Sequence, residues 1–328
     1  MDDSGAEGTV RRRGAAYVVL SHRDPEQIAR LTAAIRLSSP NSSVFVSHDG
    51  RGSAAPVSLD PHVYVREHGR ESDWGSFEVV RATLDAFAWA REVADPDMIV
   101  LVSGQHYPCR QLQNWETEFL AAGGGWIGWP SPLMYTPKWH GNAESGDDRA
   151  HIMRYSYRWF RVPGLAREEG RAFGLLRRIL SRTEKLVAVR LLPRGQGVRI
   201  GVRRWPAPFT EDRPCYKSEA WYATDRRLLD DVLSRAVPGD RWFETFRHSL
   251  VPDEAYVQTL LSWQAAAQTD QATTYADWSG GGAHPKVLEL TDLDAIRASG
   301  AGFCRKVEPE RSAALLEALD EVSRYRDA

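Results

Sequence analysis

The sequence predicts an α/β fold in which a mostly parallel central sheet is flanked by helices. In the first hundred residues, short apolar runs rich in β-forming residues alternate with amphipathic segments of helical period. This alternation is typical of parallel strands that are joined by crossover helices. The run DMIVLVS at 97–103 is also apolar enough for a strand buried on both faces. In such folds, ligands bind at the carboxyl ends of the strands.

The first elements follow one another closely along the chain. The run AAYVVL at Ala15–Leu20 predicts the first strand, and Asp24–Pro25 predicts a helix start with a capping aspartate and a first-turn proline. SVFVS at Ser43–Ser47 and HVYV at His62–Val65 predict two further strands. Ser76 is expected to cap FEVVRATLDAFAWAREV, an amphipathic helix of about four turns.

The second half of the chain has a less regular pattern. The polar-aromatic segment 123–148 and the Arg/Gly/Pro-rich segment 193–214 are expected to be loop excursions, and long loops are often functional. Helices are expected at 225–236, from Pro252–Glu254 onwards, from a cap at Thr291 with Asp294 three residues later, and at 309–326.

Composition limits the classes of protein that fit. The net charge is −2 and the pI about 6.5, so no overall field attracts nucleic acid or an anionic membrane. The sequence contains no run of about 18 apolar residues, so no membrane span is expected. Three widely separated cysteines favour a reducing compartment, and we expect a cytoplasmic protein. Lysine supplies only five of the 42 basic residues, which suggests a GC-rich bacterial genome.

Residues 1–13 lack the apolar stretch of a signal peptide and are expected to form a disordered tail. Residues 14–328 are expected to form one domain. Within it, 14–110 is the nucleotide-binding half and 111–328 the acceptor and catalytic half.

Six segments between Ala15 and Asp320 carry recognisable motifs in a fixed order. They are SHRDPEQIARL, VFVSHDG, DWGSFEVVRATLDA, MIVLVSGQHYPCR, LVPDEAYVQTLL and the block from YADW to CRKVEP. Together they resemble the core-2/I-branching β-1,6-N-acetylglucosaminyltransferases, a family that includes the peptide xylosyltransferases. The resemblance implies a GT-A-like fold of Rossmann type and transfer from a UDP-sugar.

The resemblance also implies a set of catalytic roles. Glu254, which follows Pro252-Asp253, matches the general base that takes a proton from the acceptor hydroxyl. Asp253 is expected to stabilise the start of the following helix instead. Lys286 and Lys306 match the two basic residues that neutralise the departing diphosphate in place of a metal ion.

No metal or other cofactor is expected. Asp95-Pro96-Asp97 precedes its strand, the wrong end for a ligand site, and Asp292–Asp294 lies in the first turn of a helix. The nine histidines show no zinc-type spacing.

Several residues are candidates for substrate contacts. His22, Arg23 and Asp49 follow predicted strands and are expected to contact uracil and ribose. Trp278 matches an acceptor-sugar contact. The remaining acceptor or donor-sugar candidates, of which the two arginines rest on a looser alignment, are Trp74, Gln105, His106, Arg149, Arg154 and Trp221.

The sequence departs from the family pattern at three places. His106 stands where the family usually has Asp, and Ser218-Glu219 stands where it has Gly-Ser. Lys286 stands where animal members carry Arg, which keeps the charge but loses the bidentate fork.

The sequence therefore predicts an inverting, metal-independent glycosyltransferase. Its expected partners are a UDP-sugar donor and a saccharide-containing acceptor, either a glycan or a glycosylated natural product. N-acetylglucosamine is the favoured sugar, with glucose and xylose as alternatives. A catalytically silent carbohydrate- or nucleotide-binding protein on the same fold is the second hypothesis. A dinucleotide oxidoreductase is disfavoured because no Gly-x-Gly-x-x-Gly follows the first strand.

Overall fold

The computed structural model describes residues 13–133, 146–162, 186–192, 197–264, 267–268, 271–280 and 284–324. The expected tail at 1–13 lies outside these residues except for Arg13, whose backbone N–H donates a 2.9 Å hydrogen bond to the Asp97 carboxylate.

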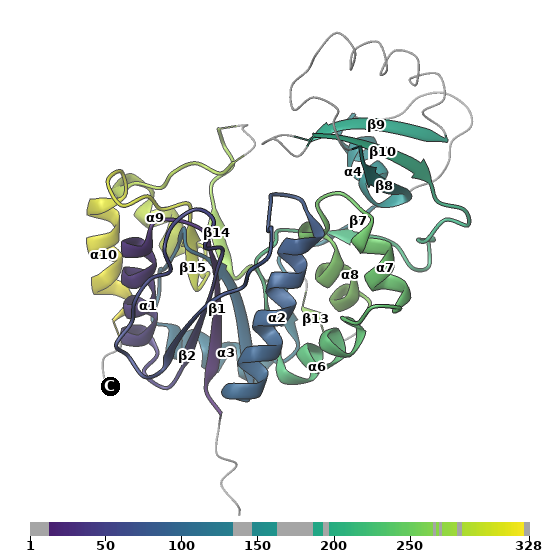
Figure 1. The fold of residues 1–328 in the computed structure, drawn as a ribbon. Coiled ribbons are helices and arrows are strands. Elements are labelled where there is room, and N and C mark those ends of the chain that lie inside the picture. The colour runs from purple at the N-terminus through teal and green to yellow at the C-terminus, as the bar shows by residue number, and fades with distance from the viewer. Residues whose placement is uncertain are drawn as a thin grey trace, which may run out of the picture.

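A seven-stranded sheet forms the centre of the molecule (Figure 1). Its order is β13-β6-β12-β4-β1-β2-β3, and the four strands from β4 to β3 run parallel. The strands are β1 (Ala15–Ser21), β2 (Ser43–His48), β3 (Val63–Glu67), β4 (Met98–Ser103), β6 (Gly125–Trp126), β12 (Ala223–Asp225) and β13 (Ala267–Gln268). The predicted α/β fold is confirmed. The strand order reverses between β1 and β4, and such a switch point favours a ligand site at the carboxyl ends of the strands.

The two faces of this sheet bury separate apolar clusters. Successive residues of β1 point to opposite faces, so Tyr17 and Val19 lie in one cluster and Ala16 and Val18 in the other. Helices on the first face are α1 (Pro25–Ser38), α3 (Leu112–Ala122), α9 (Leu293–Ala298) and α10 (Ala313–Ser323). Helices on the second face are α2 (Phe77–Val93), α6 (Arg226–Arg235), α7 (Arg241–Arg247) and α8 (Tyr256–Ser262).

Three smaller sheets complete the described structure. One has the order β14-β15-β5, another β8-β10-β9, and the third pairs β11 with β7. Their strands are β5 (His106–Pro108), β7 (Ser131–Leu133), β8 (Tyr157–Arg161), β9 (Val187–Leu192), β10 (Gly197–Arg203), β11 (Cys215–Lys217), β14 (Thr274–Ala276) and β15 (Phe303–Arg305). The β8-β10-β9 sheet follows α4 (Gly146–Ser156) and stands apart from the central sheet, at the end where the parallel strands finish (Figure 1).

Some expected loops contain regular structure. Strand β10 lies within 193–214, because Val198, Ile200 and Val202 alternate with other residues at the period of a strand. The described parts of 123–148 contain β6, β7 and the start of α4. The expected division at residue 110 does not divide the sheet, since β6, β12 and β13 extend it with strands from the second half.

Helix starts differ from the expected caps. Asp24 and Ser76 occupy N-cap positions, but neither side chain makes a capping hydrogen bond. The expected Thr291–Asp294 cap is replaced by a capping box between Glu289 and Asp292, which opens the 3₁₀ turn η3 (Leu290–Asp292). Residues Pro252–Glu254 form another 3₁₀ turn, η2, directly before α8.

Candidate active site

The loops after β1 and β2 meet at the carboxyl end of the sheet. The Ser21 hydroxyl and His48 Nδ1 are 2.8 Å apart, and the Asp49 N–H donates to the Ser21 carbonyl at 2.8 Å. Gly52 lies so close to the exposed His22 that a Cβ there would be 2.1 Å from the His22 carbonyl oxygen. The structure therefore places His22 and Asp49, two predicted nucleotide contacts, on adjoining loops.

Asp49 is an ionised carboxylate with partners inside the protein. It accepts hydrogen bonds from Arg51 Nη2 at 2.6 Å and from the Ser72 hydroxyl at 2.7 Å. The hydrogen bonds from Arg51 are the largest cause of a pKa well below the usual aspartate range. Arg51 also contacts Asp73 at 3.1 Å, and its side chain is about half exposed. A ligand at this edge therefore meets Arg51 beside Asp49, and the sequence motif did not single out Arg51.

The two predicted phosphate-binding lysines lie on adjoining backbone segments. The Lys306 N–H donates to the Lys286 carbonyl at 3.4 Å, and the Val307 N–H donates to the Gln105 carbonyl at 3.0 Å. Lys286 Nζ contacts Asp292 at 2.8 Å, and Lys306 Nζ contacts a different carboxylate at 2.7 Å.

That second carboxylate, Glu308, links the lysines to the loop after β1. Its pKa is lowered, first by the hydrogen bond from Lys306 and also by the charge of Arg23. Arg23 makes its own ion pair with Asp24 at 3.2 Å. The structure thus brings Arg23, Gln105 and both lysines to one region.

Glu254 lies at the end of the 3₁₀ turn η2 and is held through one oxygen. Its Oε2 accepts a hydrogen bond from Arg154 Nη1 at 3.1 Å and lies 3.8 Å from Lys217 Nζ. No residue in the described ranges donates a hydrogen bond to Oε1. Arg154 and Arg149 both belong to α4, but the side chain of Arg149 lies outside what the structure describes. The geometry fixes the carboxylate and leaves one oxygen available to accept a proton.

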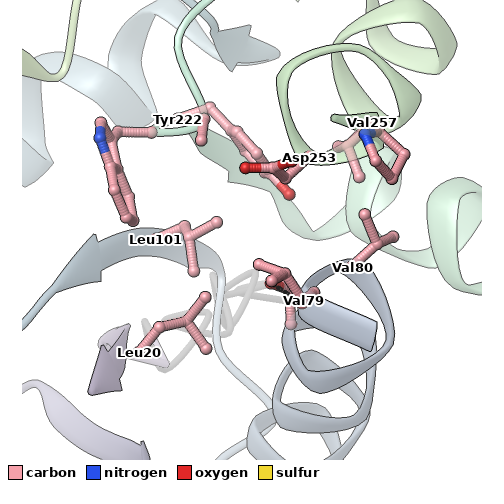
Figure 2. Close-up of a pocket in the computed structure, with 11 residues that line it drawn as sticks. Leu20, Val79, Val80, Leu101, Tyr222, Asp253 and Val257 are labelled. Carbon is pink, nitrogen blue, oxygen red and sulfur yellow. Dashed lines mark hydrogen bonds between the residues drawn. The ribbon is translucent and has the colours of Figure 1, made fainter. Parts of the chain in front are cut away.

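The neighbouring Asp253 differs from its expected role at a helix start. It lines a cavity of about 60 Å³, and its Oδ1 is buried without a hydrogen-bond partner (Figure 2). Most other residues around the cavity are apolar, among them Leu20, Val80 and Leu101. Burial, followed by the charge of Glu254, raises the pKa of Asp253 to about 7. The cavity is too small for a sugar ring, since ligand pockets usually measure hundreds of Å³.

A chain of contacts joins the Glu254 turn to the lysines. The Ser218 N–H donates to the Glu254 carbonyl at 3.0 Å. In the next residue, Glu219, Oε1 accepts a 3.1 Å hydrogen bond from the indole N–H of Trp278. The Lys286 N–H donates to the carbonyl of Asp277 at 2.8 Å. Trp278 is 48% exposed, so part of its ring can contact a ligand.

His106 and Trp221 form a layered cluster. The His106 side chain is fully buried, its Nδ1 accepts from the Ser103 N–H at 3.0 Å, and its ring packs edge-on against Trp221 at 4.6 Å. A direct substrate contact by His106 is therefore corrected to a supporting contact beneath Trp221. Arg305, which the sequence motifs did not single out, lies with its guanidinium carbon 4.8 Å from the Trp221 ring centre.

Trp74 has a structural contact as well as its predicted role. Its part-buried ring packs against a small apolar cluster that includes Met153, Trp159 and Val251. This packing ties the β8-β10-β9 sheet to the loop before α2. Its contact with substrate stays a prediction.

The Asp-x-Asp strings lie where the sequence placed them. Asp95 contacts Arg91 and Arg226 before β4, at the end of the sheet away from the candidate site. Asp292 contacts Lys286. Within the described ranges, no group of three or more His, Cys, Asp or Glu side chains could hold a metal ion.

Residues 199–303 match the family model described as Core-2/I-Branching enzyme. The matched segment is less than half of the chain. This match confirms the family resemblance and the prediction of a glycosyltransferase. The matched residues include Glu254, Trp278 and Lys286, and they end before Arg305 and Lys306.

Several solved structures are similar to this chain at low sequence identity. Similar solved structures include S. aureus TarS, residues 1–349, at 12% identity over 40% of this chain and 39% of that chain, with a TM-score of 0.26. The bifunctional glycosyltransferase WbbM is 9% identical over 90% of this chain and 46% of that chain, with a TM-score of 0.38. A putative glucose-1-phosphate thymidylyltransferase from Bacillus anthracis, in complex with a sucrose, is 7% identical over 96% of this chain and 97% of that chain, with a TM-score of 0.29. The aligned region spans less than half of the first two chains, and all three TM-scores are low. A comparison with curated proteins gave no match.

No helix in the described part of the chain has the length and apolar character needed to cross a bilayer.

Proposed function

We propose that this protein is an inverting, metal-independent glycosyltransferase of the core-2/I-branching type that uses a UDP-sugar. The observation that carries the proposal is the state of Glu254. Arg154 and Lys217 hold one of its oxygens, and the other is unpartnered among the described residues. A base in a displacement reaction needs such an available oxygen within reach of the acceptor hydroxyl.

The proposed reaction is a single displacement. The acceptor hydroxyl oxygen attacks the anomeric carbon as the bond from that carbon to the diphosphate oxygen breaks. Glu254 Oε1 takes the hydroxyl proton, and UDP leaves with its bonding electron pair. The sugar is transferred with inverted configuration, and the proton on Glu254 is later released to solvent.

Charge on the leaving diphosphate is neutralised by Lys286 and Lys306 in this proposal. Their backbones adjoin each other, and both side chains carry acidic partners, Asp292 and Glu308, that hold the ammonium groups in place. Fixed cations next to a developing negative charge stabilise the transition state more than the ground state. Asp95 and Asp292 have arginine or lysine partners, which supports a mechanism that needs no Asp-x-Asp metal site.

The substrates follow from the same assignments. His22, Arg23 and Asp49 are proposed to contact uracil and ribose, with Arg51 as an added contact. N-acetylglucosamine is the first candidate for the transferred sugar, with glucose and xylose next. The acceptor is a glycan or glycosylated natural product, which stacks on the exposed face of Trp278. Three buried cysteines without disulfides support a cytoplasmic setting.

UDP release from a panel of UDP-sugars, with and without saccharide acceptors, tests the proposal. We expect one UDP-sugar to be consumed rapidly only when an acceptor is present. UDP or sugar binding without acceptor-dependent release would instead favour the catalytically silent binding protein.

A further inference from the structure

Arg305 is a cation without a carboxylate partner. It ends β15, and its Nε is buried with no hydrogen-bond partner. It makes no ion pair with any described carboxylate, whereas Lys286 and Lys306 each have one at 2.7–2.8 Å. Its guanidinium lies over the Trp221 ring. Among the described residues, no carboxylate thus makes an ion pair with this part-buried positive charge.

The strand opposite Arg305 does not supply the missing charge. His106 is its register partner on β5, and directly opposed residues share one face of a sheet. Burial, and next the charge of Arg305, holds the pKa of His106 well below its usual value, so this imidazole is neutral. Burial also lowers the pKa of Arg305, to about 10, so the guanidinium stays charged at neutral pH.

The acidic group whose charge acts on Arg305 has a hydrogen-bond partner of its own. Glu219 opposes the lowering of the Arg305 pKa through its charge, but its Oε1 accepts the indole hydrogen bond of Trp278. Glu219 also follows Ser218, which is bonded to the Glu254 turn. Arg305 therefore lies beside the aromatic rings on the Glu254 side of the site, where the acceptor is expected.

We propose that Arg305 binds a carboxylate carried by the acceptor sugar, so that the enzyme prefers an acceptor that ends in a uronic acid. The inference rests on the proposed function, which it refines by naming the acceptor class. A part-buried charge is costly unless it is paired, and a bound carboxylate would supply the pair. The planar guanidinium presents two parallel N–H groups that match the two oxygens of a carboxylate.

The main experiment compares two acceptors that differ only in this group: a saccharide ending in glucuronic acid and its counterpart ending in glucose. The wild-type enzyme is expected to favour the uronate in kcat/KM by roughly tenfold to a hundredfold, the range for a hydrogen bond to a charged group. Arg305→Gln should remove this preference and leave UDP affinity unchanged. Arg247→Gln is the matched control, because Arg247 is an exposed residue whose ion-pair partner among the described residues is Glu244 on α7.

A second variant tests the same idea without removing the arginine. His106→Asp places a carboxylate opposite Arg305, where it competes with the substrate for the guanidinium. We expect transfer to the uronate acceptor to fall by a larger factor than transfer to the neutral acceptor, so that the uronate preference decreases. This variant carries the test if Arg305→Gln does not fold.

Four results would overturn the inference. They are equal wild-type rates on the two acceptors, an unchanged preference in both variants, loss of UDP affinity in Arg305→Gln with the preference intact, and a preference for UDP-glucuronic acid over UDP-glucose that depends on Arg305. The third result would assign Arg305 to the diphosphate and the fourth to the donor sugar. If no acceptor in the panel supports UDP release, the proposed function fails, and NMR-detected binding of methyl glucuronide against methyl glucoside still decides the inference.

Discussion

The lysine side and the glutamate side of the site balance their charges differently. On the lysine side, Lys286 and Lys306 are neutralised by Asp292 and Glu308 before any ligand binds. On the glutamate side, Arg154 and Lys217 hold Glu254, and Arg305 makes no ion pair with a carboxylate in the described part of the chain. In the proposed reaction, the donor diphosphate therefore has to share or displace existing ion pairs, whereas the proposed base is held in place before substrate binds.

A similar contrast exists between two consecutive carboxylates. Glu254 is part-exposed and paired with Arg154, whereas Asp253 lines a mostly apolar cavity and its buried Oδ1 has no hydrogen-bond partner among the described residues. Proton transfer to substrate requires access as well as basicity. Neutral substitution should therefore reduce the transfer rate strongly at Glu254 and only slightly at Asp253.

The largest expected effect is on transfer by Glu254→Gln. The amide keeps the shape of the side chain but cannot take a proton, so we expect a rate loss of roughly a hundredfold to ten-thousandfold. UDP affinity should change little, because the glutamate side does not hold the diphosphate. Steady-state transfer and UDP titration on one preparation measure both. Near wild-type transfer would remove Glu254 from the role of base.

Asp253→Asn is the matched control for that substitution. Its rate should stay within about tenfold of the wild type, because Asp253 lines a small apolar cavity that cannot hold the acceptor sugar. A rate loss equal to that of Glu254→Gln would show that the two carboxylates act as one unit.

The next effect sharpens the lysine side. Lys306→Ala should slow transfer on the order of a hundredfold and weaken UDP binding, since one fixed cation is lost. Glu308→Gln should instead tighten UDP binding about twofold to fivefold, because the competing ion pair is removed. Lys286→Arg should be tolerated within about threefold, because the charge is kept. Calorimetric titration measures the UDP affinity of all three variants, and a steady-state assay measures their transfer rates. An unchanged UDP affinity in Lys306→Ala would make this lysine a surface charge.

The smallest effect concerns the stability of the fold. The folded-state pKa of Asp253 is about 7, above the ordinary value of 3.8. The folded protein therefore holds this proton more tightly than the unfolded chain, and the stabilisation present below pH 4 is lost as the pH rises to 7. Asp253→Asn removes this dependence. Its free energy of unfolding should exceed that of the wild type by an amount that grows between about pH 4 and pH 7. Urea denaturation at several pH values measures this, and a constant or opposite difference would contradict the assignment.

The parts of the fold that could be predicted were those with a strong local pattern. The strand at 97–103 and the helix at Phe77–Val93 bury faces that their periodicity reveals. Strand β10 was missed because its arginines and glycines favour a loop, although Val198, Ile200 and Val202 alternate. The cap predicted at Ser76 was only half right, because capping also depends on how the side chain rotates.

The candidate site was predictable where a motif names a residue and less so where contacts join distant segments. Glu254 and both lysines come from motifs. The isolation of Arg305, by contrast, depends on the register between β15 and β5 and on a neutral residue at His106. The partial engagement of Asp49 depends on Arg51, which reaches back two residues to bind it. Such facts follow from geometry that residue types alone do not specify.

The most direct test of the central claim is the configuration of the product. The wild-type enzyme is given an α-linked UDP-sugar and its acceptor in excess chelator, and the new linkage is assigned by proton NMR. The account predicts a β-linked product formed without added metal, because Glu254 drives one displacement and the lysines neutralise UDP. An α-linked product, or a product that forms only when manganese is restored, would contradict it.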